Sequence, residues 1–451
     1  MKRFIEKKLL GWKESSRRKP LIVRGARQVG KTYSIQKFGR AAFLNLHTVD
    51  LEKRRNLHGI FEGDLNPERI ISELEIFLNE KITPGKSLLF FDEIQSCPRA
   101  IMALRYLYEE LPELHVIAAG SLLEFSMIDI SFPVGRTQFL DMYPLTFPEY
   151  LIAIGREEAA NIVLSKPKPV SDSIHRLLLD ELKKYFFIGG MPESVKVYVD
   201  SKSLNESFLV HRELCESFRH DFSKYTPHIR TECLDSVLTG TARHVGQQII
   251  YTHLTDLCSH PTVKKAFHTL CKARVISKVS SASPAGLPLK ATALSKRFKA
   301  ILVDIGLWTH LNEIDIAKEY PRADLLSIYQ GAMAEQFVGQ EILAAQNLSL
   351  YYWSRSAKSS TAEVDYLAVI DGKIIPVEVK SGPSARLRSL HLLLETFQNY
   401  PFGVIFSSAP FAELEKQKLK FIPLYYVYSM TKGSEETSKE TPSFLNIKSV
   451  K

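Results

Sequence analysis

The sequence predicts an α/β protein in which a parallel sheet is followed by a helical region and a second α/β unit. Apolar runs at residues 21–23, 87–91 and 115–119 alternate with helical patterns, which is typical of parallel strands. A glycine-rich loop directly follows the first run. Near the other end of the chain, alternating β-branched runs flank Asp371 and Gly372, a pair typical of a two-residue hairpin turn.

Length and composition limit the class of protein. A chain of 451 residues is too long for one ordinary domain. Hydrophobic residues make up 45% of it and charged residues 24%, which is typical of a soluble globular protein. The net charge of +9 weakly favours a polyanionic partner, although a phosphate-binding protein can be mildly basic without touching nucleic acid.

The cysteines and the start of the chain bear on location. The cysteines are scattered and odd in number without a C-x-x-C pair, which argues against a disulfide framework and against a zinc site. The first residues carry charge but no apolar core, so they do not predict a signal peptide, and no apolar run is long enough to span a membrane. We therefore expect a cytoplasmic protein with no membrane partner. The cysteines are Cys97, Cys215, Cys233, Cys258 and Cys271.

The first strand leads into the most informative motif of the chain. Residues 1–19 predict an amphipathic helix and a basic turn. After the strand, residues 25–32 read G-x-x-x-x-G-K-T ahead of a candidate helix, which is the context of a phosphate-binding loop. Lys31 would reach the β- and γ-phosphates of ATP, and the Thr32 hydroxyl would bind Mg²⁺. The alternative is an ordinary glycine turn with a surface lysine. The loop residues are Gly25, Ala26, Arg27, Gln28, Val29, Gly30, Lys31 and Thr32.

A second buried strand, residues 87–91, ends in two carboxylates. Asp92 would hold Mg²⁺ through water, and Glu93 would orient the attacking water as a general base. Two adjacent carboxylates are costly to bury there without a cation, although a strand that ends in a solvated turn is the alternative. The elements expected between the loop and this strand are a helix over residues 32–38, a strand over 43–46 and a helix over 64–80.

The third apolar run ends near Ser121. Its hydroxyl could hydrogen-bond the γ-phosphate or the attacking water from the neighbouring strand. A serine at the end of a strand is often only a cap, so this motif alone is weak.

Together these motifs resemble a prokaryotic family of AAA+ ATPases in which the ATPase is followed by a C-terminal domain of unknown function. The similarity rests on residues 25–32, 89–95, 119–124 and 143–150. It implies an AAA+ fold, ATP and Mg²⁺. It also implies that Arg136 is suited to contact nucleotide, either in cis or from a neighbouring subunit of a homo-oligomer, with a plain surface arginine as the alternative.

The middle of the chain predicts helices followed by a winged helix. A helix over residues 174–187 ends at residues 189–193, Gly-Gly-Met-Pro-Glu, which is similar to a hallmark of the family and which we interpret as a structural corner. Three short helical patterns then precede a strand over residues 274–279 and a returning strand over 287–292. Basic residues on or beside the third helix would contact DNA phosphates, and a solvated basic face is the alternative. These residues are Lys264, Lys265, Lys272 and Arg274.

The predicted hairpin has a defined register. With Asp371 and Gly372 as its turn, Ile370 pairs with Lys373. Pro376 lies inside the second strand and cannot donate to the ladder, so we expect a bulge or an edge there.

This register gathers charged residues on one face. It places Asp365 opposite Glu378 and Glu363 opposite Lys380. Facing carboxylates repel unless a cation lies between them, and Mg²⁺ fits, while Lys380 would position water or steady a developing phosphate charge. The pattern resembles the PD-(D/E)xK nuclease superfamily, which implies a further acidic ligand, Glu335, on an upstream helix. An exposed face with two salt bridges, or a nuclease fold retained for binding, are the alternatives.

These observations lead to one expected architecture and two candidate functions. The leading function is a Mg²⁺-dependent ATPase coupled to a nucleic-acid-binding or nuclease module. Its runner-up is a nucleotide-dependent switch or scaffold that binds a protein partner through an inert nuclease-like domain. The expected parts are an AAA+ P-loop NTPase domain with a parallel sheet over residues 1–165, a helical linker over 166–230, a winged-helix-like region over 231–320, a restriction-endonuclease-like α/β domain over 321–430 and a disordered tail over 431–451.

Overall fold

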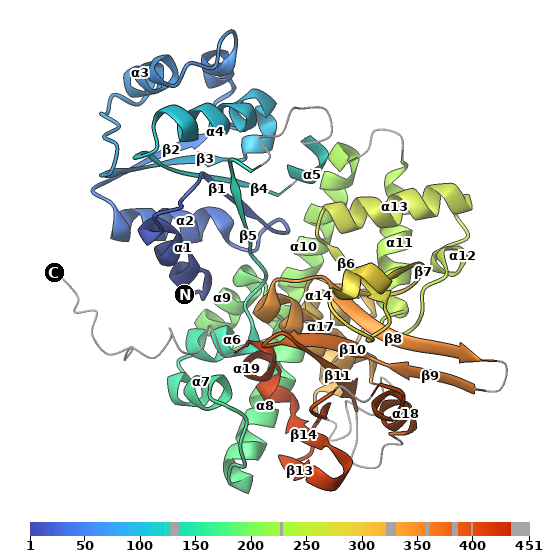
Figure 1. The fold of residues 1–451 in the computed structure, drawn as a ribbon. Helices are drawn as coiled ribbons and strands as arrows, with labels where there is room; N and C mark the ends of the chain where they lie inside the picture. Colours follow the sequence, from blue (N-terminus) through green and yellow to red (C-terminus); the bar gives the residue numbers. More distant parts are fainter. Residues whose placement is uncertain are drawn as a thin grey trace.

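The computed structural model describes residues 1–121, 123–126, 135–225, 229–321, 331–357, 360–380, 387–397 and 400–433. Over these residues the chain forms three sheets with helices around and between them. Figure 1 shows the N-terminal sheet set apart from the two others, with a layer of helices between them. The helices of this layer include α10 (Leu204–Tyr225), α14 (Ile305–Leu311) and α17 (Ala332–Gln346), and α8 (Asp172–Ile188) packs against α10 and α14.

The N-terminal sheet is parallel and has the order β2-β3-β4-β1-β5. It confirms the predicted parallel α/β sheet. The second strand begins at Asn45 rather than at residue 43, because Phe43 caps the preceding helix. The fifth strand was not predicted, since only Leu140 in it is buried and no apolar run marks it. The strands are β1 (Leu21–Arg24), β2 (Asn45–Asp50), β3 (Ser87–Asp92), β4 (His115–Gly120) and β5 (Gln138–Asp141).

Helices cover both faces of this sheet, which is why its central strands are apolar throughout. Leu21 and Val23 point to the face covered by α1 (Ile5–Glu14) and α2 (Lys31–Ala42). Ile22, between them, points to the face covered by α3 (Pro67–Leu78) and α4 (Pro98–Glu110), where residues of η1 (Arg55–Phe61) also pack. The alternation follows from the period of two along a strand.

The corner at residues 189–193 joins α8 to α9 (Pro192–Ser201) and lies against the ATPase part. The Leu145 amide donates to the Gly190 carbonyl oxygen at 2.6 Å, and the Gly190 amide donates to Asp304 Oδ2 at 2.6 Å. A Cβ on Gly190 would lie 2.0 Å from the Leu145 carbonyl oxygen, so only glycine fits. The motif therefore forms the expected corner, with the second helix starting at its proline.

The next helices precede a hairpin, as the sequence predicts, but the hairpin is not isolated. The helices α11 (Thr231–Arg243), α12 (Tyr251–Leu254) and α13 (His260–Lys272) lead to β6 (Ile276–Ser281). The predicted returning strand over residues 287–292 is wrong, because residues 289–292 form a 3-10 turn, η3 (Leu289–Thr292). The returning strand is β7 (Leu294–Leu302). β6 also pairs with β8 (Leu350–Ala357), which pairs with β9 (Ser360–Val364), so the hairpin belongs to a larger sheet of order β7-β6-β8-β9.

Two short helices, α6 (Phe147–Ala153) and α7 (Glu157–Leu164), come between β5 and α8.

A disulfide corrects the prediction from the cysteine pattern. Cys233 of α11 is joined to Cys258, with Cα atoms 6.3 Å apart. Cys258 lies between α12 and α13, which both pack against α11, and spacing along the chain does not reveal this contact.

The C-terminal sheet has the order β10-β11-β12-β14-β13. Its first hairpin confirms the predicted pairing of Ile370 with Lys373. At Pro376 the expected bulge is absent, because β11 pairs with β10 without a shift. The alternative of an edge is confirmed locally, because the ladder of β11 with β12 begins only after Pro376, at Val377. The strands are β10 (Tyr366–Ile370), β11 (Lys373–Val379), β12 (Gly403–Ser407), β13 (Ala412–Leu414) and β14 (Leu419–Pro423).

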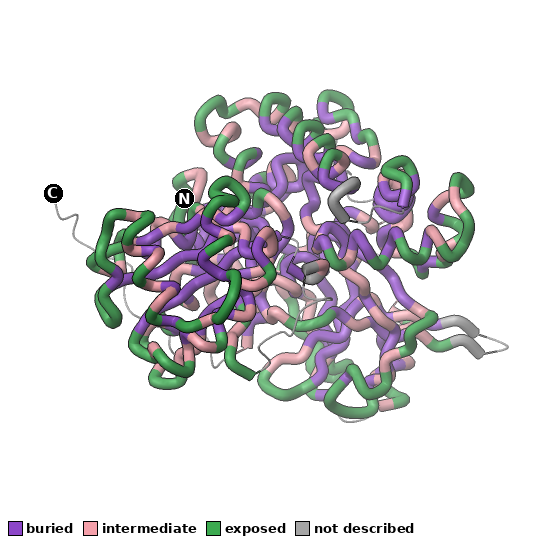
Figure 2. The backbone as a smooth tube through the Cα atoms, turned by 90° about the horizontal axis from the view of Figure 1, so that it is seen from above, coloured by how far each residue is buried: buried purple, intermediate pink, exposed green. Residues whose placement is uncertain are grey.

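One hydrophobic cluster joins the parts that the sequence predicted as separate domains. It includes Leu21 of β1, Phe186 of α8, Phe337 of α17 and Val377 of β11. Figure 2 shows buried residues continuing through the middle of the molecule. α19 (Val427–Thr431) extends the fold to the start of the predicted tail, with Thr431 buried, and residues 434–451 of that tail lie outside the described residues.

Candidate functional site

The phosphate-binding loop connects β1 to α2, as the sequence predicts. Gln28 and Gly30 have φ angles of 64° and 93°, which turn the backbone into the left-handed region. Lys31 is the first residue of α2, and its Nζ donates to the carbonyl oxygens of Gly25 at 3.0 Å and Ala26 at 2.8 Å. Burial lowers the pKa of Lys31 to about 8, against the opposing effect of the Glu93 and Asp92 carboxylates.

The acidic end of β3 meets this loop. Thr32 Oγ1 donates to Asp92 Oδ1 at 3.1 Å, and burial raises the pKa of Asp92 to about 6. Glu93 has a φ of 47°, and its carboxylate accepts a hydrogen bond from Gln95 Nε2 at 2.5 Å. A hydroxyl and a carboxylate in contact are suitable oxygen ligands for Mg²⁺, and a loop with left-handed turns is suited to cradle phosphate. The residues present therefore fit Mg²⁺-ATP.

The register of the sheet places Ser121 close to the loop and Arg136 far from it. Ser121 follows β4, whose Gly120 pairs with Arg24 at the end of β1, so the serine lies at the loop edge of the sheet. Arg136 precedes β5, whose first residue pairs with the first residue of β1. It therefore lies at the opposite end of the strands from the loop. Its Nε pairs with Glu109 Oε1 at 2.6 Å. Contact between Arg136 and nucleotide in cis is therefore wrong, and contact from a neighbouring subunit stays a prediction.

Two side chains of the loop are held by α10. Arg27 forms an ion pair with Asp221, and Gln28 Nε2 donates to Ser217 Oγ at 3.2 Å. Asp221 is buried, so the guanidinium compensates a charge that would otherwise be costly there. The conformation of the loop is thereby coupled to a helix of the middle region.

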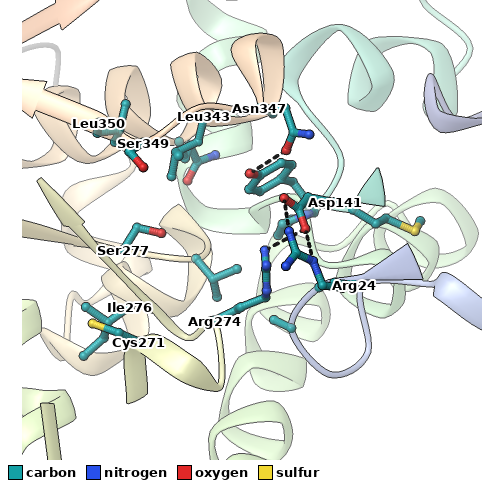
Figure 3. Close-up of a pocket in the computed structure, with 18 of the residues that line it drawn as sticks. Arg24, Asp141, Cys271, Arg274, Ile276, Ser277, Leu343, Asn347, Ser349 and Leu350 are labelled. Carbon is teal, nitrogen blue, oxygen red and sulfur yellow. Dashed lines mark hydrogen bonds and ion pairs between the residues drawn. The ribbon is translucent and has the colours of Figure 1, made fainter. Parts of the chain in front are cut away.

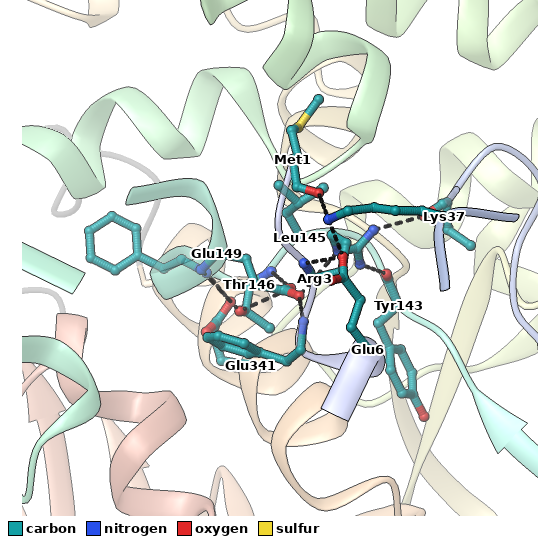
Figure 4. Close-up of polar contacts among 12 residues, drawn as sticks. Met1, Arg3, Glu6, Lys37, Tyr143, Leu145, Thr146, Glu149 and Glu341 are labelled. Atoms are coloured by element: carbon teal, nitrogen blue, oxygen red, sulfur yellow. Dashed lines mark hydrogen bonds and ion pairs between the residues drawn. The ribbon is translucent and has the colours of Figure 1, made fainter. Parts of the chain in front are cut away.

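Arg3 ties the loop to the segment after β5. Its guanidinium donates to the Val29 carbonyl oxygen at 3.0 Å, to the Tyr143 carbonyl oxygen at 2.7 Å and to Glu149 Oε1 at 3.1 Å. Figure 4 shows Arg3 at the centre of this group, with Glu341 of α17 nearby. Glu341 Oε1 accepts from the Phe147 amide at 3.0 Å, so the network extends to the C-terminal part.

A cavity of about 800 Å³ lies beside the loop, where the three parts of the chain meet. Its basic residues come from the ATPase part and from the middle region of the chain. Arg24 binds both oxygens of Asp141, at 2.9 and 3.1 Å, and Arg274 reaches the same carboxylate at 3.0 Å. Figure 3 shows both guanidinium groups directed at Asp141. The basic residues that line the cavity are Arg24, His268, Lys272, Arg274 and Lys278.

The predicted hairpin site is altered by a break in the strand. Asp365 lies between β9 and β10, and its Oδ2 accepts from the Val379 amide at 2.8 Å. The pairing of Glu363 with Lys380 is wrong, because the chain changes sheets at Asp365 and Glu363 pairs with Ser354 of β8. Lys380 instead contacts Glu378 at 2.5 Å.

A lysine that the sequence analysis missed lies among these carboxylates. Lys299 of β7 contacts Glu335, Glu363 and Asp365. Over the residues that the structure describes, no group of three or more histidine, cysteine, aspartate or glutamate side chains is arranged to hold a metal ion. Metal binding by Glu335, Asp365 and Glu378 therefore stays a prediction. The apolar run after Lys299 was a weak signal that this lysine is buried in a strand.

Other residues of the phosphate site also escaped the sequence analysis. Arg3 and Asp221 are isolated charges in helical patterns, with no motif around them. Gln95 is different, because it lies in the acidic motif two residues after Glu93 and its side chain faces the same carboxylate. The position of Gln95 two residues after Glu93 could therefore have predicted its contact with that carboxylate.

Comparison with protein families assigns the N-terminal part. Residues 17–151 match the model of an AAA domain. This match and the parallel sheet support an AAA-type ATPase domain that binds and hydrolyses nucleotide. Residues 179–318 and 330–427 match two domains of unknown function, DUF8612 and DUF4143. No curated protein matches the chain.

Several solved structures are similar to parts of the chain. The Walker-type ATPase of Pyrococcus abyssi has 16% sequence identity and a TM-score of 0.43, and the match covers 69% of this chain and 95% of that one. The ORC1 protein of Aeropyrum pernix, in complex with DNA, has 12% identity and a TM-score of 0.28 over 69% and 90% of the two chains. AMPPCP-bound DnaA from Aquifex aeolicus has 11% identity and a TM-score of 0.28 over 59% and 86%.

Among the helices of the described ranges, none combines the length and the apolar character needed to cross a bilayer.

Proposed function

We propose that the chain is a Mg²⁺-dependent ATP hydrolase that couples its nucleotide state to the binding of a nucleic acid. Bound Mg²⁺-ATP supplies the phosphoryl group and a cation that neutralises its charge. Lys31 and the loop amides would bind the phosphates, with Thr32 and Asp92 as metal ligands. Glu93 would take the proton of the attacking water, and its hydrogen bond with Gln95 orients it for that role.

The cavity beside the loop is the observation that carries the coupling. Its wall includes Gly25 and Ala26 of the loop together with Lys272 and Arg274, two of the residues predicted to contact nucleic-acid phosphates. Burial is the main cause of the lowered pKa of Lys31, and the charge of Arg274 adds to it, so the two cations interact. An anion bound by Arg274 would therefore change the field at the phosphate loop.

The charge of the cavity favours a phosphate-bearing ligand. The cavity wall contains the cations Arg24, Lys272, Arg274 and Lys278 together with the carboxylate of Asp141. Glu341 also lines the wall, but burial raises its pKa well above the usual range, which favours its neutral form. The order of α11, α12, α13 and the β6–β7 hairpin supports a winged-helix-like origin for this basic wall.

The test is binding of labelled single- and double-stranded DNA and RNA, measured by fluorescence anisotropy with and without a non-hydrolysable ATP analogue. Arg274→Ala and Lys272→Ala should each weaken binding, and each should reduce its dependence on salt by about one phosphate contact. Lys290→Ala is the matched control, because Lys290 is exposed in the same region and does not line the cavity. The proposal is contradicted if no polymer binds, or if these variants leave the binding unchanged.

A second candidate is a nucleotide-dependent switch that binds a protein partner while its nuclease-like domain is inert. The lysine among the carboxylates of the hairpin site favours an inert domain. Cleavage of labelled DNA or RNA with Mg²⁺ or Mn²⁺ distinguishes the two. Cleavage that is lost in Asp365→Ala would restore the nuclease proposal with Glu378 and Lys380 as its other catalytic groups. Intact ATP hydrolysis without cleavage or nucleic-acid binding would favour the protein partner.

Assembly and location belong to the same proposal. We infer a protein that acts as a homo-oligomer if Arg136 serves a neighbouring nucleotide site; its cytoplasmic location stays a prediction, which the Cys233–Cys258 disulfide does not favour. Mixing Arg136→Ala with Lys31→Ala subunits tests this, because only a site shared between subunits lets two inactive variants complement each other.

A further inference from the structure

Lys299 is a buried cation surrounded by carboxylates from three different elements. Its side chain is 2% exposed. Its Nζ lies 2.9 Å from Glu335 Oε1 of α17, 2.5 Å from Glu363 Oε1 of β9 and 3.4 Å from Asp365 Oδ1. The ammonium group donates hydrogen bonds to Glu335 and Asp365 and forms an ion pair with Glu363, so three carboxylates compensate its charge.

The remaining groups of the site form a second pair. Lys380 Nζ lies 2.5 Å from Glu378 Oε1, and within the described part of the chain Glu378 Oε2 is buried without a hydrogen-bond partner. Four carboxylates thus face two ammonium groups. Burial raises the pKa of Glu335 to about 7 and that of Glu378 to about 8, which lets protons neutralise part of the excess negative charge.

The position of Lys299 is incompatible with a metal ion on the same oxygens. Mg²⁺ binds oxygen at about 2.0–2.1 Å and requires near-octahedral geometry, whereas the ammonium already lies at hydrogen-bond distance from Glu335, Glu363 and Asp365. Lys299 lies on a strand that pairs with β6, and its aliphatic part is enclosed by the core. Its Nζ also lies 5.4 Å from the centre of the Tyr352 ring, a further contact that favours the cation.

We propose that Lys299 is the resident cation of this acidic site and closes it to divalent metal ions in the native chain. The site would then act as a fixed charge cluster that joins β7, α17 and the β9–β10 junction. Metal-dependent cleavage of a phosphodiester at Asp365 and Glu378 is excluded as long as the ammonium group stays in place. Removing that group should create a site for one divalent cation.

The experiment is titration of the full chain with Mn²⁺ in the absence of nucleotide, read by electron paramagnetic resonance. The wild type should show no Mn²⁺ binding that depends on Asp365. Lys299→Met should gain one Mn²⁺ equivalent, and Asp365→Asn in that background should remove it. Lys420→Met is the control, since Lys420 contacts a single carboxylate, Glu413, in the neighbouring sheet and should gain nothing.

The folding of the variant is tested in the same series. Lys299→Met leaves three carboxylates without their cation, so a second variant, Lys299→Met with Glu363→Gln, removes one negative charge as well. Mn²⁺ should raise the unfolding midpoint of either variant by several degrees and leave that of the wild type unchanged.

Each outcome decides the proposal. Asp365-dependent Mn²⁺ binding by the wild type overturns it, and so does a folded variant that gains no site. If both variants fail to fold, the wild-type titration decides: absence of an Asp365-dependent site supports the proposal. The ATPase and nucleic-acid-binding experiments can fail without affecting this result, because they involve other residues. Cleavage of DNA or RNA that is lost in Asp365→Ala would overturn it.

Discussion

The phosphate loop and the hairpin site contain the same kinds of residue in opposite arrangements. Each combines a buried lysine with carboxylates at the end of a strand. In the phosphate loop, Lys31 turns to backbone carbonyl oxygens and the carboxylate of Asp92 contacts a hydroxyl. In the hairpin site, Lys299 turns directly to the carboxylates.

The difference shows how one set of residues can build either a ligand site or a structural cluster. Burial lowers the pKa of Lys31, because its backbone partners only partly compensate the charge. Burial acts in the same direction on Lys299, but the charges of Glu335, Asp365 and Glu363 outweigh it and raise the pKa well above its usual value. A lysine whose charge is poorly compensated is ready for an anion, and one that is fully paired stabilises the fold.

Lys299→Met should have the largest effect on stability. Removing one partner of a buried ion-pair cluster typically costs about 3–5 kcal/mol, because the remaining charges lose their compensation. Chemical denaturation of the full chain measures the free energy of unfolding. Lys420→Met, at a half-exposed pair, should change it by about 1 kcal/mol or less. Equal effects of the two substitutions would show that Lys299 stabilises the fold no more than a half-exposed ion pair does.

Lys31→Ala should have the opposite profile. We expect the rate of ATP hydrolysis to fall by about 10²–10³, since one positioned donor to the phosphates is lost. The unfolding midpoint should not fall, because burial already disfavours the charge of Lys31. Steady-state ATPase assays and thermal unfolding check both parts, with the exposed Lys53→Ala as the control. A strongly destabilised Lys31→Ala would show that this lysine is structural too.

Glu93→Gln should separate binding of ATP from its hydrolysis. Loss of a general base typically lowers the rate by about 10²-fold or more, while an amide of the same shape keeps the contact with Gln95. Titration with a fluorescent ATP analogue should give an unchanged affinity. Undiminished hydrolysis would assign the base to another group.

The pH dependence of stability should report on the hairpin site. Burial, with the nearby Asp365 charge, raises the pKa of Glu378 from 4.5 to about 8, so the folded state keeps a proton that the unfolded state loses. This contribution is fully present below pH 4.5 and is lost as the pH rises towards 8, with a slope of about 1.4 kcal/mol per pH unit for one proton. Glu378→Gln should flatten that slope, and the exposed Glu413→Gln should not.

The smallest expected effect concerns the contact between the loop and α10. Arg27→Ala and Asp221→Asn should each alter ATP affinity, and a double-mutant cycle should give a coupling of about 0.5–1 kcal/mol, since the guanidinium is partly exposed. Additive effects would mean that α10 does not sense the nucleotide through this pair.

Local signals in the sequence determined the ATPase part. Each signal lies within a few residues: the apolar runs of β1, β3 and β4, the loop before α2 and the acidic end of β3. Such signals are local because strands, turns and helix starts depend on residues that are near in the chain. The turn at Asp371 and Gly372 likewise determined the register of β10 with β11.

Only the tertiary structure decided which charges meet. Lys299 and Glu363 are far apart in the chain and lie on the two outer strands of one sheet, yet the folded chain brings their side chains into contact. Arg27 and Asp221 meet because α10 packs beside the loop, and Cys233 and Cys258 because α12 and α13 both pack against α11. Electrostatic pairing depends on distance in space and on burial, and neither is fixed by spacing along the chain. The sequence could therefore predict that the hairpin carboxylates need a cation, but not that the chain provides its own.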